Sequence, residues 1–526
     1  MTHLAVAIMV HSGEQAQATA VRAAELGADL VEFRIDRFTD DLLQLTTLIE
    51  RCPLPSIVTC RPTWEGGHYD GDETHRITLL EQIANAVHPP TYLDIELIAF
   101  QRSQRLRQVL ARIVDHPGQV RRTCTGLILS SHDFGGRPAD LYQRIEAMVA
   151  APMSRVIKVA WTARSLRDNL EAFEIVDQRH KPTIALCMGE AGLASRVLAK
   201  KFGALLTFAA LEADLGTAPG QPTLTALKEL YRWDAINAQT TVYGVIGNPV
   251  GHSKSPAIHN AGFDAVDDNS VYLPLPIPPE YEHFKATVSA WLDMPSLQFR
   301  GASVTLPHKE HLLRFVRESG GRIEPLAEQI GAANTLVVRE NGGLEAFNTD
   351  YAAALDAVCE GIDCARDGLE GRRVAVIGAG GAARAVVAGF AHYGANVVVY
   401  NRTLENARRL ADQFGKEAGK VVPAGLNKLC DSCCQIYINC TPIGMHPDTN
   451  ATPLGNQKPA RGWGPGTVVF DTIYNPVTTR LLREARTDGC MVISGLEMFV
   501  RQAAAQFTMW TGKKAPLEVF RRVLTA

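Results

Sequence analysis

The sequence predicts an α/β protein: an N-terminal (β/α)8 barrel followed by a two-lobed unit that contains a Rossmann dinucleotide-binding domain. Up to about residue 235, short apolar runs alternate with amphipathic stretches at intervals of about 22–35 residues, the spacing of a strand–loop–helix–loop unit. This rhythm changes beyond residue 240, and a glycine-rich turn joins two apolar runs within 372–400. A chain of 526 residues also exceeds the roughly 250–300 residues that one hydrophobic core organises.

The composition is that of an ordinary globular protein, with 46% hydrophobic and 21% charged residues and a net charge of −3. This balance argues against a nucleic-acid-binding protein and against a polybasic membrane binder. No apolar run approaches the roughly 20 residues of a membrane span, and the apolar run 4–10 leaves no room for a signal peptide before it. The 11 cysteines are scattered, which suits a reducing compartment. We therefore expect a cytoplasmic protein.

Eight candidate strands divide the first part of the chain, and apolar residues at helical spacing fill the intervals, as over 78–87. Eight such units over residues 1–237 predict a closed barrel, with a doubly wound open sheet as the alternative. A helix is expected over 224–236, before the boundary. The candidate strands span 4–10, 29–36, 56–61, 91–97, 125–131, 155–161, 183–188 and 205–211.

Two further domains are expected in the second part of the chain. Residues 241–350 hold about three strand–helix alternations and form an α/β domain. Residues 351–495 contain the βαβ unit and form the Rossmann domain. A final helical region, about 496–526, is expected to pack back onto the 241–350 domain and complete it.

Lys158 stands in the middle of the apolar run 155–161, which is typical of a short buried strand. Burying an ammonium group without a partner costs several kcal/mol or forces it to lose its proton. In a (β/α)8 barrel the chemistry lies at the carboxyl ends of the strands, so we expect other polar residues at the same end. Those that follow or end the candidate strands are Glu32, Arg34, Arg61, Glu65, Asp94, Glu96, His132, Arg196, Thr217 and Gln221.

Each of these residues alone has a purely structural interpretation, for example Glu32 and Arg34 as an ion pair on one strand face. Together they favour a ligand site, because desolvated charges from different strands need one another or a ligand. A desolvated lysine amine can attack a ketone and form a Schiff base, with His132 as general base and then acid. The substrate is expected to be a polar carboxylate. A Schiff-base aldolase remains the enzymatic alternative.

These motifs resemble type I 3-dehydroquinate dehydratase across residues 1–235: Glu-Phe-Arg-Ile-Asp, Thr-Cys-Arg with Glu-Gly-Gly, Ser-His-Asp-Phe, Lys-Val-Ala, Ser-Arg and Ala-Pro-Gly-Gln. The resemblance implies that Lys158 forms an imine with the C3 ketone of 3-dehydroquinate. It implies that His132 removes the C2 proton, with Glu65 assisting. Ring hydroxyls would be bound by Glu32, Arg34 and Arg61, and the carboxylate by Arg196 and Gln221; Thr217 stands where many members have serine.

A strand that runs into glycines and opens a helix lies at 371–383. Its glycines would let the backbone approach a pyrophosphate at the helix N-terminus. The next strand, 395–400, should end at the adenine ribose, where an NAD enzyme places Asp or Glu. This chain has Asn401, Arg402 and Thr403 there, and a cation beside two hydrogen-bonding side chains predicts NADP.

Four polar segments surround this unit in the sequence, at 247–256, 303–309, 331–335 and 348–350. They supply hydroxyls, a lysine, an asparagine and an aspartate. Beside a dinucleotide fold, such groups suggest a polyhydroxylated substrate and a hydride transfer.

Over residues 241–526 these motifs, with Asp-Thr-Ile-Tyr-Asn-Pro at 471–476, resemble shikimate dehydrogenase, and the domain order resembles the fused plant form. The resemblance implies that residues 241–350 bind the substrate and that Lys309 and Asp350 are the catalytic pair. Ser303 stands where bacterial relatives usually have Asn. The implied substrate residues are Ser253, Ser255, Thr305, Asn334, Thr349, Tyr474 and Gln502. The implied cofactor residues are Gly378, Ala379, Gly380, Gly381, Ala382, Asn401, Arg402, Thr403, Thr441, Gly495 and Met498.

The sequence therefore predicts a bifunctional enzyme that dehydrates 3-dehydroquinate and then reduces 3-dehydroshikimate to shikimate with NADPH. Hydroxyls at Ser255 and Thr349 favour shikimate over quinate. No metal is expected, because the CxxC at Cys430 and Cys433 has no second pair or nearby histidine to complete a zinc set. A retired barrel used as a scaffold and a non-enzymatic metabolite sensor are the alternatives, although each would tolerate the loss of catalytic residues that are all present.

Overall fold

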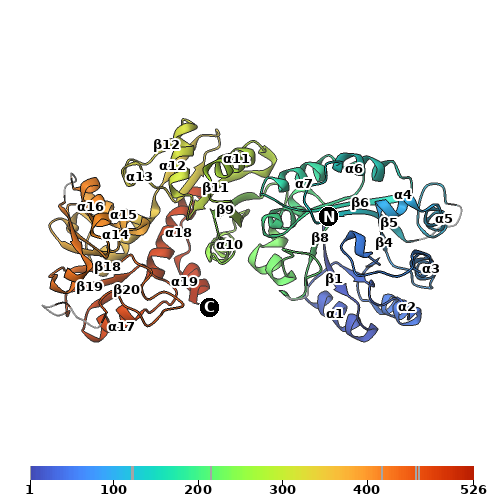
Figure 1. The fold of residues 1–526 in the computed structure, drawn as a ribbon, viewed down its shortest axis with the longest axis horizontal. Helices are drawn as coiled ribbons and strands as arrows, with labels where there is room; N and C mark the ends of the chain where they lie inside the picture. The colour runs from blue at the N-terminus through green and yellow to red at the C-terminus, as the bar shows by residue number, and fades with distance from the viewer. Residues whose placement is uncertain are drawn as a thin grey trace. The chain divides into compact units, whose positions relative to one another are not determined.

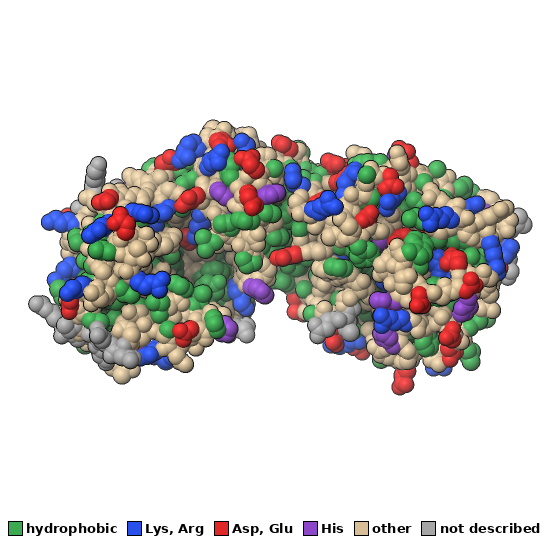
Figure 2. All heavy atoms as spheres, viewed as in Figure 1, with side chains coloured by type: hydrophobic (Ala, Val, Ile, Leu, Met, Phe, Trp, Pro, Cys, Tyr) green, Lys and Arg blue, Asp and Glu red, His purple; other side chains and the backbone are tan. Residues whose placement is uncertain are grey.

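A computed structural model describes residues 2–119, 124–213, 216–415, 419–455, 459 and 463–525 (Figure 1). The chain divides into two compact units: one holds Met1–Val242, Asn269–Ile277 and Ala286–Gln298, and the other holds the remainder. No helix in the described ranges is long and apolar enough to cross a bilayer. On the face drawn in Figure 2, basic and acidic side chains are interspersed, as the small net charge leads one to expect.

The first unit contains eight parallel strands in the order β7-β6-β5-β4-β3-β2-β1-β8. The amide of Leu205, just before β8, donates to the carbonyl of Thr183 in β7 at 2.9 Å and brings the two ends of the sheet together. The barrel prediction is confirmed, and the open-sheet alternative is wrong. The strands are β1 His3–Met9, β2 Leu30–Arg34, β3 Ser56–Thr59, β4 Tyr92–Glu96, β5 Gly126–Asp133, β6 Ser154–Thr162, β7 Thr183–Met188 and β8 Leu206–Ala209.

Helices lie outside this ring of strands (Figure 1). They are α1 Gly13–Glu25, α2 Leu42–Arg51, α3 Glu73–Ala84, α4 Leu97–Arg102, α5 Gln104–Ile113, α6 Leu141–Ala150, α7 Asp168–Asp177, α8 Leu193–Val197 and α9 Ala199–Phe202. A short 3-10 turn, η1 Thr63–Glu65, follows β3 and carries the glutamate predicted to assist His132.

The two-residue period of a strand explains how the barrel interior changes from apolar to polar. Leu30, Ile128 and Val156 belong to one buried apolar cluster inside the ring. Two positions farther along the same strands, and so on the same face, stand Glu32, Ser130 and Lys158. The apolar layer therefore forms the floor on which the polar layer rests.

The prediction of one α-helix over 224–236 is wrong, because the segment forms two separate short turns. The chain there makes a π-helical turn, Ala226–Leu230, and a separate 3-10 turn, Trp233–Ala235. Between them Arg232 adopts a left-handed backbone with φ of 55°, which ends any right-handed helix. Arg232 Nη1 donates to the carbonyl of Ser270 at 2.7 Å, so a tertiary contact holds the break in place.

A mixed sheet follows, in the order β10-β9-β11-β13-β14-β12. Its strands are β9 Thr241–Gly247, β10 Ser270–Pro276, β11 Phe299–Val304, β12 Arg322–Ile323, β13 Thr335–Val338 and β14 Leu344–Phe347. The helices of this region are α10 Ser255–Ala265, α11 Tyr281–Leu292, α12 Lys309–Glu318 and α13 Pro325–Ile330.

The third sheet is parallel throughout, in the order β17-β16-β15-β18-β19-β20. The order reverses at β15, which creates the crevice where doubly wound folds bind ligands. Its strands are β15 Arg373–Ile377, β16 Asn396–Asn401, β17 Val421–Gly425, β18 Ile436–Asn439, β19 Val468–Asp471 and β20 Met491–Ile493. Its helices are α14 Thr349–Gly361, α15 Gly381–His392, α16 Leu404–Phe414 and α17 Arg480–Thr487.

The last two helices are α18 Gly495–Thr511 and α19 Leu517–Thr525; α18 packs against β11 and β13 of the mixed sheet, and α19 packs against α10 and α18. Trp510 Nε1 donates to the carbonyl of Leu336 in β13 at 2.9 Å, and Gln506 Nε2 donates to Thr335 Oγ1 at 3.0 Å. Phe507 stacks on Phe263 of α10 with ring centroids 5.3 Å apart. One face of α18 is thereby fixed against the mixed sheet.

Candidate active sites

The barrel cavity lies at the carboxyl ends of the strands and brings together every site residue predicted for this unit. It is lined by Glu32, Arg34, Arg61, Glu65, His132, Lys158, Arg196, Thr217 and Gln221. Apolar side chains, among them Phe134 and Phe208, complete the lining. A single cavity that gathers charged groups from this many strands is the mark of a binding site.

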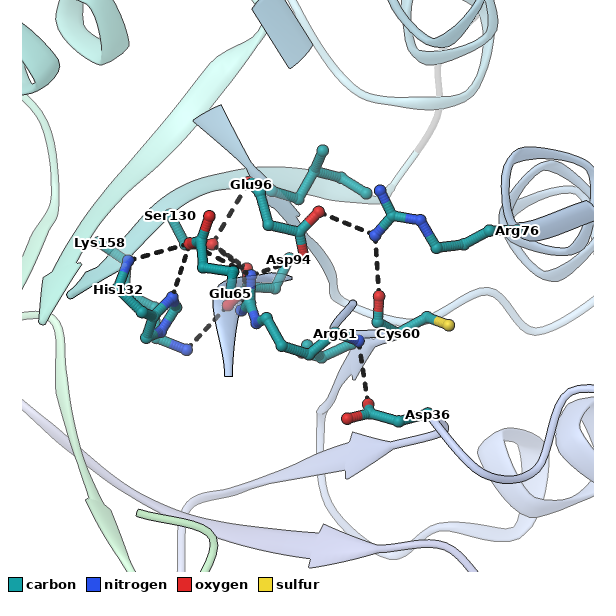
Figure 3. A network of polar contacts seen from close by, with 12 residues as sticks. Asp36, Cys60, Arg61, Glu65, Arg76, Asp94, Glu96, Ser130, His132 and Lys158 are labelled. Carbon is teal, nitrogen blue, oxygen red and sulfur yellow. Dashed lines mark hydrogen bonds and ion pairs between the residues drawn. The ribbon is translucent and has the colours of Figure 1, made fainter. Parts of the chain in front are cut away.

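Lys158 is buried, 5% exposed, and its ammonium nitrogen is paired (Figure 3). Its Nζ donates to Asp94 Oδ2 at 2.8 Å and lies 3.5 Å from Glu32 Oε1. It also lies 4.4 Å from the centre of the Phe208 ring. The lysine in the middle of β6 is therefore compensated from β4, while one side of its nitrogen faces an aromatic ring.

Arg61 is hydrogen-bonded on several sides, to Asp94, Glu96 and Ser130 (Figure 3). Its Nη2 donates to Asp94 Oδ1 at 2.8 Å, and its Nη1 donates to Glu96 Oε1 at 2.7 Å. Arg76 approaches Glu96 from α3, with Nη1 2.8 Å from Oε2. Arg61 therefore acts in this structure as the centre of a charge network at the edge of the cavity.

The sequence analysis placed Asp94 and Glu96 at the end of a candidate strand but predicted no function for either residue. The signal was present, because two acids flanking Ile95 must face the same side of β4. Ser130 donates to Asp94 Oδ1 at 2.5 Å and carried the same signal, because it lies two positions before His132 on β5. Arg76 had no such signal, and only the fold brings it to this network.

His132 and Glu65 form a pair at the mouth of the network. The backbone amide of His132 donates to Glu65 Oε1 at 2.9 Å, and the ring Nδ1 lies 3.0 Å from the same oxygen. Burial, with the charges of Arg61 and Lys158, lowers the pKa of His132 well below its usual value. Burial raises the pKa of Glu65 to about 8. His132 is therefore neutral at physiological pH.

The turn that carries Glu65 depends on the glycine after it. Gly66 has φ of 75°, and a Cβ placed there would lie 2.0 Å from the ring of Phe134. A side chain at this position would be strained and would push against the cavity wall. The glycine lets η1 approach His132 closely enough for the pair to form.

Arg196 and Gln221 supply the donors that the cavity leaves unused. Arg196 is 2% exposed, its Nε has no partner among the described residues, and burial lowers its pKa to about 10. The backbone amide of Thr217 donates to Gln221 Oε1 at 3.0 Å, while Gln221 Nε2 is buried with no described partner. A buried cation beside a free amide donor fits an anionic ligand such as a carboxylate.

The second cavity, of about 410 Å³, lies in the other unit. Lys309 Nζ and Asp350 Oδ2 are 2.6 Å apart in it, and Asn334 Nδ2 donates to Asp350 Oδ1 at 2.9 Å. Its predicted lining residues are Ser253, Ser255, Thr305, Lys309, Asn334, Asp350, Ala382, Tyr474, Gly495, Met498 and Gln502. A hydroxyl-rich wall around a lysine–aspartate pair suits a polyhydroxylated ligand.

Thr349 is the predicted substrate residue that does not line this cavity. It is 2% exposed, and its amide donates to Asn334 Oδ1 at 2.8 Å. Its hydroxyl accepts a hydrogen bond from Asn334 Nδ2 at 3.0 Å. Thr349 therefore lies behind Asn334 and orients that amide toward the cavity.

Gln506 and Phe499 also line the cavity and were not anticipated. Gln506 lies one helical turn after Gln502 on α18, so the i, i+4 relation was the available signal. Its Oε1 accepts a hydrogen bond from Ser303 Oγ at 2.8 Å. Phe499 stacks on Tyr474 with ring centroids 5.1 Å apart.

The backbone of the glycine-rich turn after β15 is accessible, so that a nucleotide could approach it closely. Gly378 has φ of 109°, which excludes most side chains, and a Cβ at Gly380 or Gly381 would meet nothing within 4 Å. Ala379 and Ala382 flank these glycines, and Thr441 is held at the neighbouring strand end by Asn439, 2.7 Å from its hydroxyl. These groups leave room for a pyrophosphate at the start of α15.

Asn401, Arg402 and Thr403 follow at the end of β16, as predicted. Asn401 Nδ2 donates to the carbonyl of Thr403 at 2.8 Å, which closes the turn. Arg402 and Thr403 are exposed. The guanidinium of Arg402 has the reach and charge to contact a 2′-phosphate.

Four family models match the chain. Type I 3-dehydroquinase matches residues 4–238, and the shikimate dehydrogenase substrate binding domain matches residues 245–336. Shikimate / quinate 5-dehydrogenase matches 363–439, and the shikimate 5'-dehydrogenase C-terminal domain matches 495–525.

The chain is 38% identical over 518 residues to a bifunctional 3-dehydroquinate dehydratase/shikimate dehydrogenase of Arabidopsis thaliana, described as chloroplastic; the match covers 96% of this chain and 81% of that one. It is 41% identical over 290 residues to a shikimate dehydrogenase (NADP(+)) of Methanosarcina mazei, covering 54% of this chain and 97% of that one. A solved dehydroquinate dehydratase and shikimate dehydrogenase of S. pombe is 25% identical, covering 100% and 98% of the two chains, with a TM-score of 0.44. The cytoplasmic location expected for this chain stays a prediction.

Within the described ranges, no three His, Cys, Asp or Glu side chains are grouped so that they could hold a metal ion. Cys433 of the CxxC instead accepts a contact from Arg373 Nη1 at 2.9 Å.

Removing the charge of Arg196 should stabilise the ligand-free barrel. Arg196→Met removes a buried cation whose Nε lacks a partner among the described residues, a gain of about 1–3 kcal/mol, and should raise the thermal unfolding midpoint of the barrel by a few degrees. Differential scanning calorimetry without added anions measures this change. Arg155→Met is the control, because Arg155 is 52% exposed in its pair with Asp115 and its loss should change the midpoint little. A lower midpoint for Arg196→Met would contradict an unpaired Arg196.

Proposed function

The chain belongs to the family of fused type I 3-dehydroquinases and shikimate dehydrogenases, and we propose which residues carry out each of its two reactions. It combines a 3-dehydroquinate dehydratase with an NADP shikimate dehydrogenase. The observation that carries the proposal is the barrel cavity. A buried lysine, a neutral histidine and an arginine whose Nε has no partner among the described residues meet there. That set matches a keto acid whose ketone faces the lysine and whose carboxylate faces the arginine.

In the barrel, Lys158 attacks the C3 ketone of 3-dehydroquinate and forms an imine that acts as an electron sink. His132 Nε2 removes the C2 proton, while Glu65 accepts the hydrogen bond from Nδ1 and fixes the ring. The same histidine then assists the release of water and the hydrolysis of the imine. Arg196 and Gln221 hold the carboxylate.

In the second cavity, Lys309 delivers a proton to the reacting C3 oxygen of 3-dehydroshikimate, and Asp350 binds the adjacent hydroxyl. Their separation of 2.6 Å lets one group set the orientation of the other. Bound NADPH supplies the hydride. Ser253 and Ser255 are proposed to hold the substrate carboxylate, with Asn334, Tyr474 and Gln502 around the ring.

The choice of NADP rests on the end of β16, where Asn401, Arg402 and Thr403 replace the acid of an NAD enzyme. It agrees with the names of relatives such as the Methanosarcina mazei enzyme, which is called NADP(+)-dependent. Shikimate rather than quinate is the proposed product, because Ser255 lines the cavity and Thr349 supports Asn334 from behind.

Loss of Lys158 should separate the two reactions. Wild-type protein given 3-dehydroquinate and NADPH should oxidise the NADPH and make shikimate, whereas Lys158→Ala should do so only when 3-dehydroshikimate is added. Absorbance at the NADPH band with product identification measures both. Lys309→Met is the matched variant and should accumulate 3-dehydroshikimate. NADPH oxidation by Lys158→Ala with 3-dehydroquinate would mean that the second site makes quinate instead.

The pH dependence of dehydration should report the Glu65–His132 pair. Because the pKa of Glu65 is raised to about 8, its carboxyl is protonated below that pH and ionises as pH rises. The ionised form is the stronger acceptor of Nδ1–H and makes Nε2 the stronger base, so kcat/KM should rise with pH with its midpoint near 8. In Glu65→Gln this step should vanish, with a loss of about 10–100-fold. An unchanged pH profile in Glu65→Gln would assign the titration elsewhere.

Arg402→Ala should weaken NADP selectively. A charge-assisted contact to the 2′-phosphate contributes about 1.5–3 kcal/mol, so KM for NADP should rise about 10–100-fold while KM for NAD changes little. Steady-state kinetics with both cofactors measure the ratio. Arg408→Ala is the control, because Arg408 lies on α16 with 57% of its side chain exposed. Equal effects on the two cofactors would exclude a phosphate contact.

A further inference from the structure

Asp94 has no part in the mechanism above, yet it is the carboxylate nearest the reacting nitrogen in the described structure (Figure 3). Its Oδ2 lies 2.8 Å from Lys158 Nζ, whereas Glu32 Oε1 lies at 3.5 Å. Asp94 is 1% exposed. A charge this deep must be compensated by the groups around it.

The carboxylate of Asp94 is fixed from behind. Its Oδ1 accepts hydrogen bonds from Arg61 Nη2 at 2.8 Å and from Ser130 Oγ at 2.5 Å, which leaves Oδ2 directed at the lysine. Burial opposes ionisation, but the charges of Arg61 and Lys158 hold the pKa of Asp94 well below its usual value. Asp94 thus stays negative and cannot turn away from Nζ.

Imine formation leaves the charge at this nitrogen unchanged. When an ammonium group and a ketone condense, the C=O bond breaks and its oxygen leaves as water with two of the three ammonium protons. A C=N bond forms to Nζ, and the third proton stays there. Nζ carries one positive charge at the start and one in the iminium product. A counterion preorganised for the ammonium therefore stabilises the iminium without moving.

We propose that Asp94 is a catalytic residue of the barrel: the counterion of Nζ in both the resting ammonium and the iminium, held in place by Arg61 and Ser130. The proposal rests on the proposed imine at Lys158. It explains why an acid is buried directly against a nucleophile. A neutral residue there would leave the iminium as an unpaired cation in a dry cavity. Glu32 lies farther from Nζ, at 3.5 Å, and lines the cavity, where it can bind the substrate.

Borohydride trapping of the protein with 3-dehydroquinate tests this role. Mass spectrometry should find reduced adduct on Lys158 of the wild type, and Asp94→Asn should lower the trapped fraction about 10-fold or more, because it removes a preorganised charge beside Nζ. Glu96→Gln also removes a buried carboxylate bonded to Arg61 but does not touch Nζ, so it should lose less than about 3-fold. No adduct in wild type would overturn the proposed function itself. Equal trapping in wild type and Asp94→Asn would overturn only the role of Asp94.

A second readout separates electrostatics from folding. Without the carboxylate, the neutral amine is favoured, so Lys158 of Asp94→Asn should be carbamylated by cyanate at pH 7 about 3-fold faster or more. A merely structural role would not raise this rate selectively at Lys158. If Asp94→Asn does not fold, Ser130→Ala removes the 2.5 Å hydrogen bond with little change of volume and should lower trapping a few-fold. Unchanged trapping in Ser130→Ala would contradict the proposal.

Discussion

The barrel depends on one buried ion pair, between Lys158 on β6 and Asp94 on β4. A nucleophilic amine must be desolvated to react, and a desolvated ammonium is unstable unless a carboxylate accompanies it. The carboxylate in turn needs Arg61, Arg61 needs Glu96, and Glu96 is also bonded by Arg76 from outside the ring. Each charge is satisfied by the next, so the chain of contacts extends from the cavity to a surface helix.

The lysines proposed to act in the two units, Lys158 and Lys309, have different surroundings. The side chain of Lys158 is 6% exposed, with a fixed acid on one side and an aromatic ring on another, which suits a nitrogen that forms a covalent bond. The side chain of Lys309 is 25% exposed beside Asp350, which is itself 15% exposed. A half-open lysine can exchange its proton with solvent between turnovers, as a group that delivers a proton must.

The sequence was sufficient for the residues whose function dictates their position along a strand or at its end. Lys158 stands within β6, His132 near the end of β5 and Arg61 just after β3, and the glycines after β15 stand before a helix, so local pattern located them. Contacts between side chains far apart in the sequence escaped it. Ser130 lies beside Asp94 because β4 and β5 are paired, and Thr349 lies behind Asn334 where α14 begins next to the start of β13. The break at Arg232 also escaped, because apolar periodicity continues through it while a tertiary hydrogen bond decides the backbone.

The barrel also explains why its polar layer can be so dense. Alternation along each strand places Leu30, Ile128 and Val156 two residues before Glu32, Ser130 and Lys158, so the charges rest on a close-packed apolar floor that water cannot enter from below. Solvent reaches the network through the cavity, where Arg196 Nε and Gln221 Nε2 have no partner among the described residues. A bound carboxylate would satisfy both donors and cover the mouth at once. Substrate binding would thereby complete the desolvation on which the reactivity of Lys158 depends.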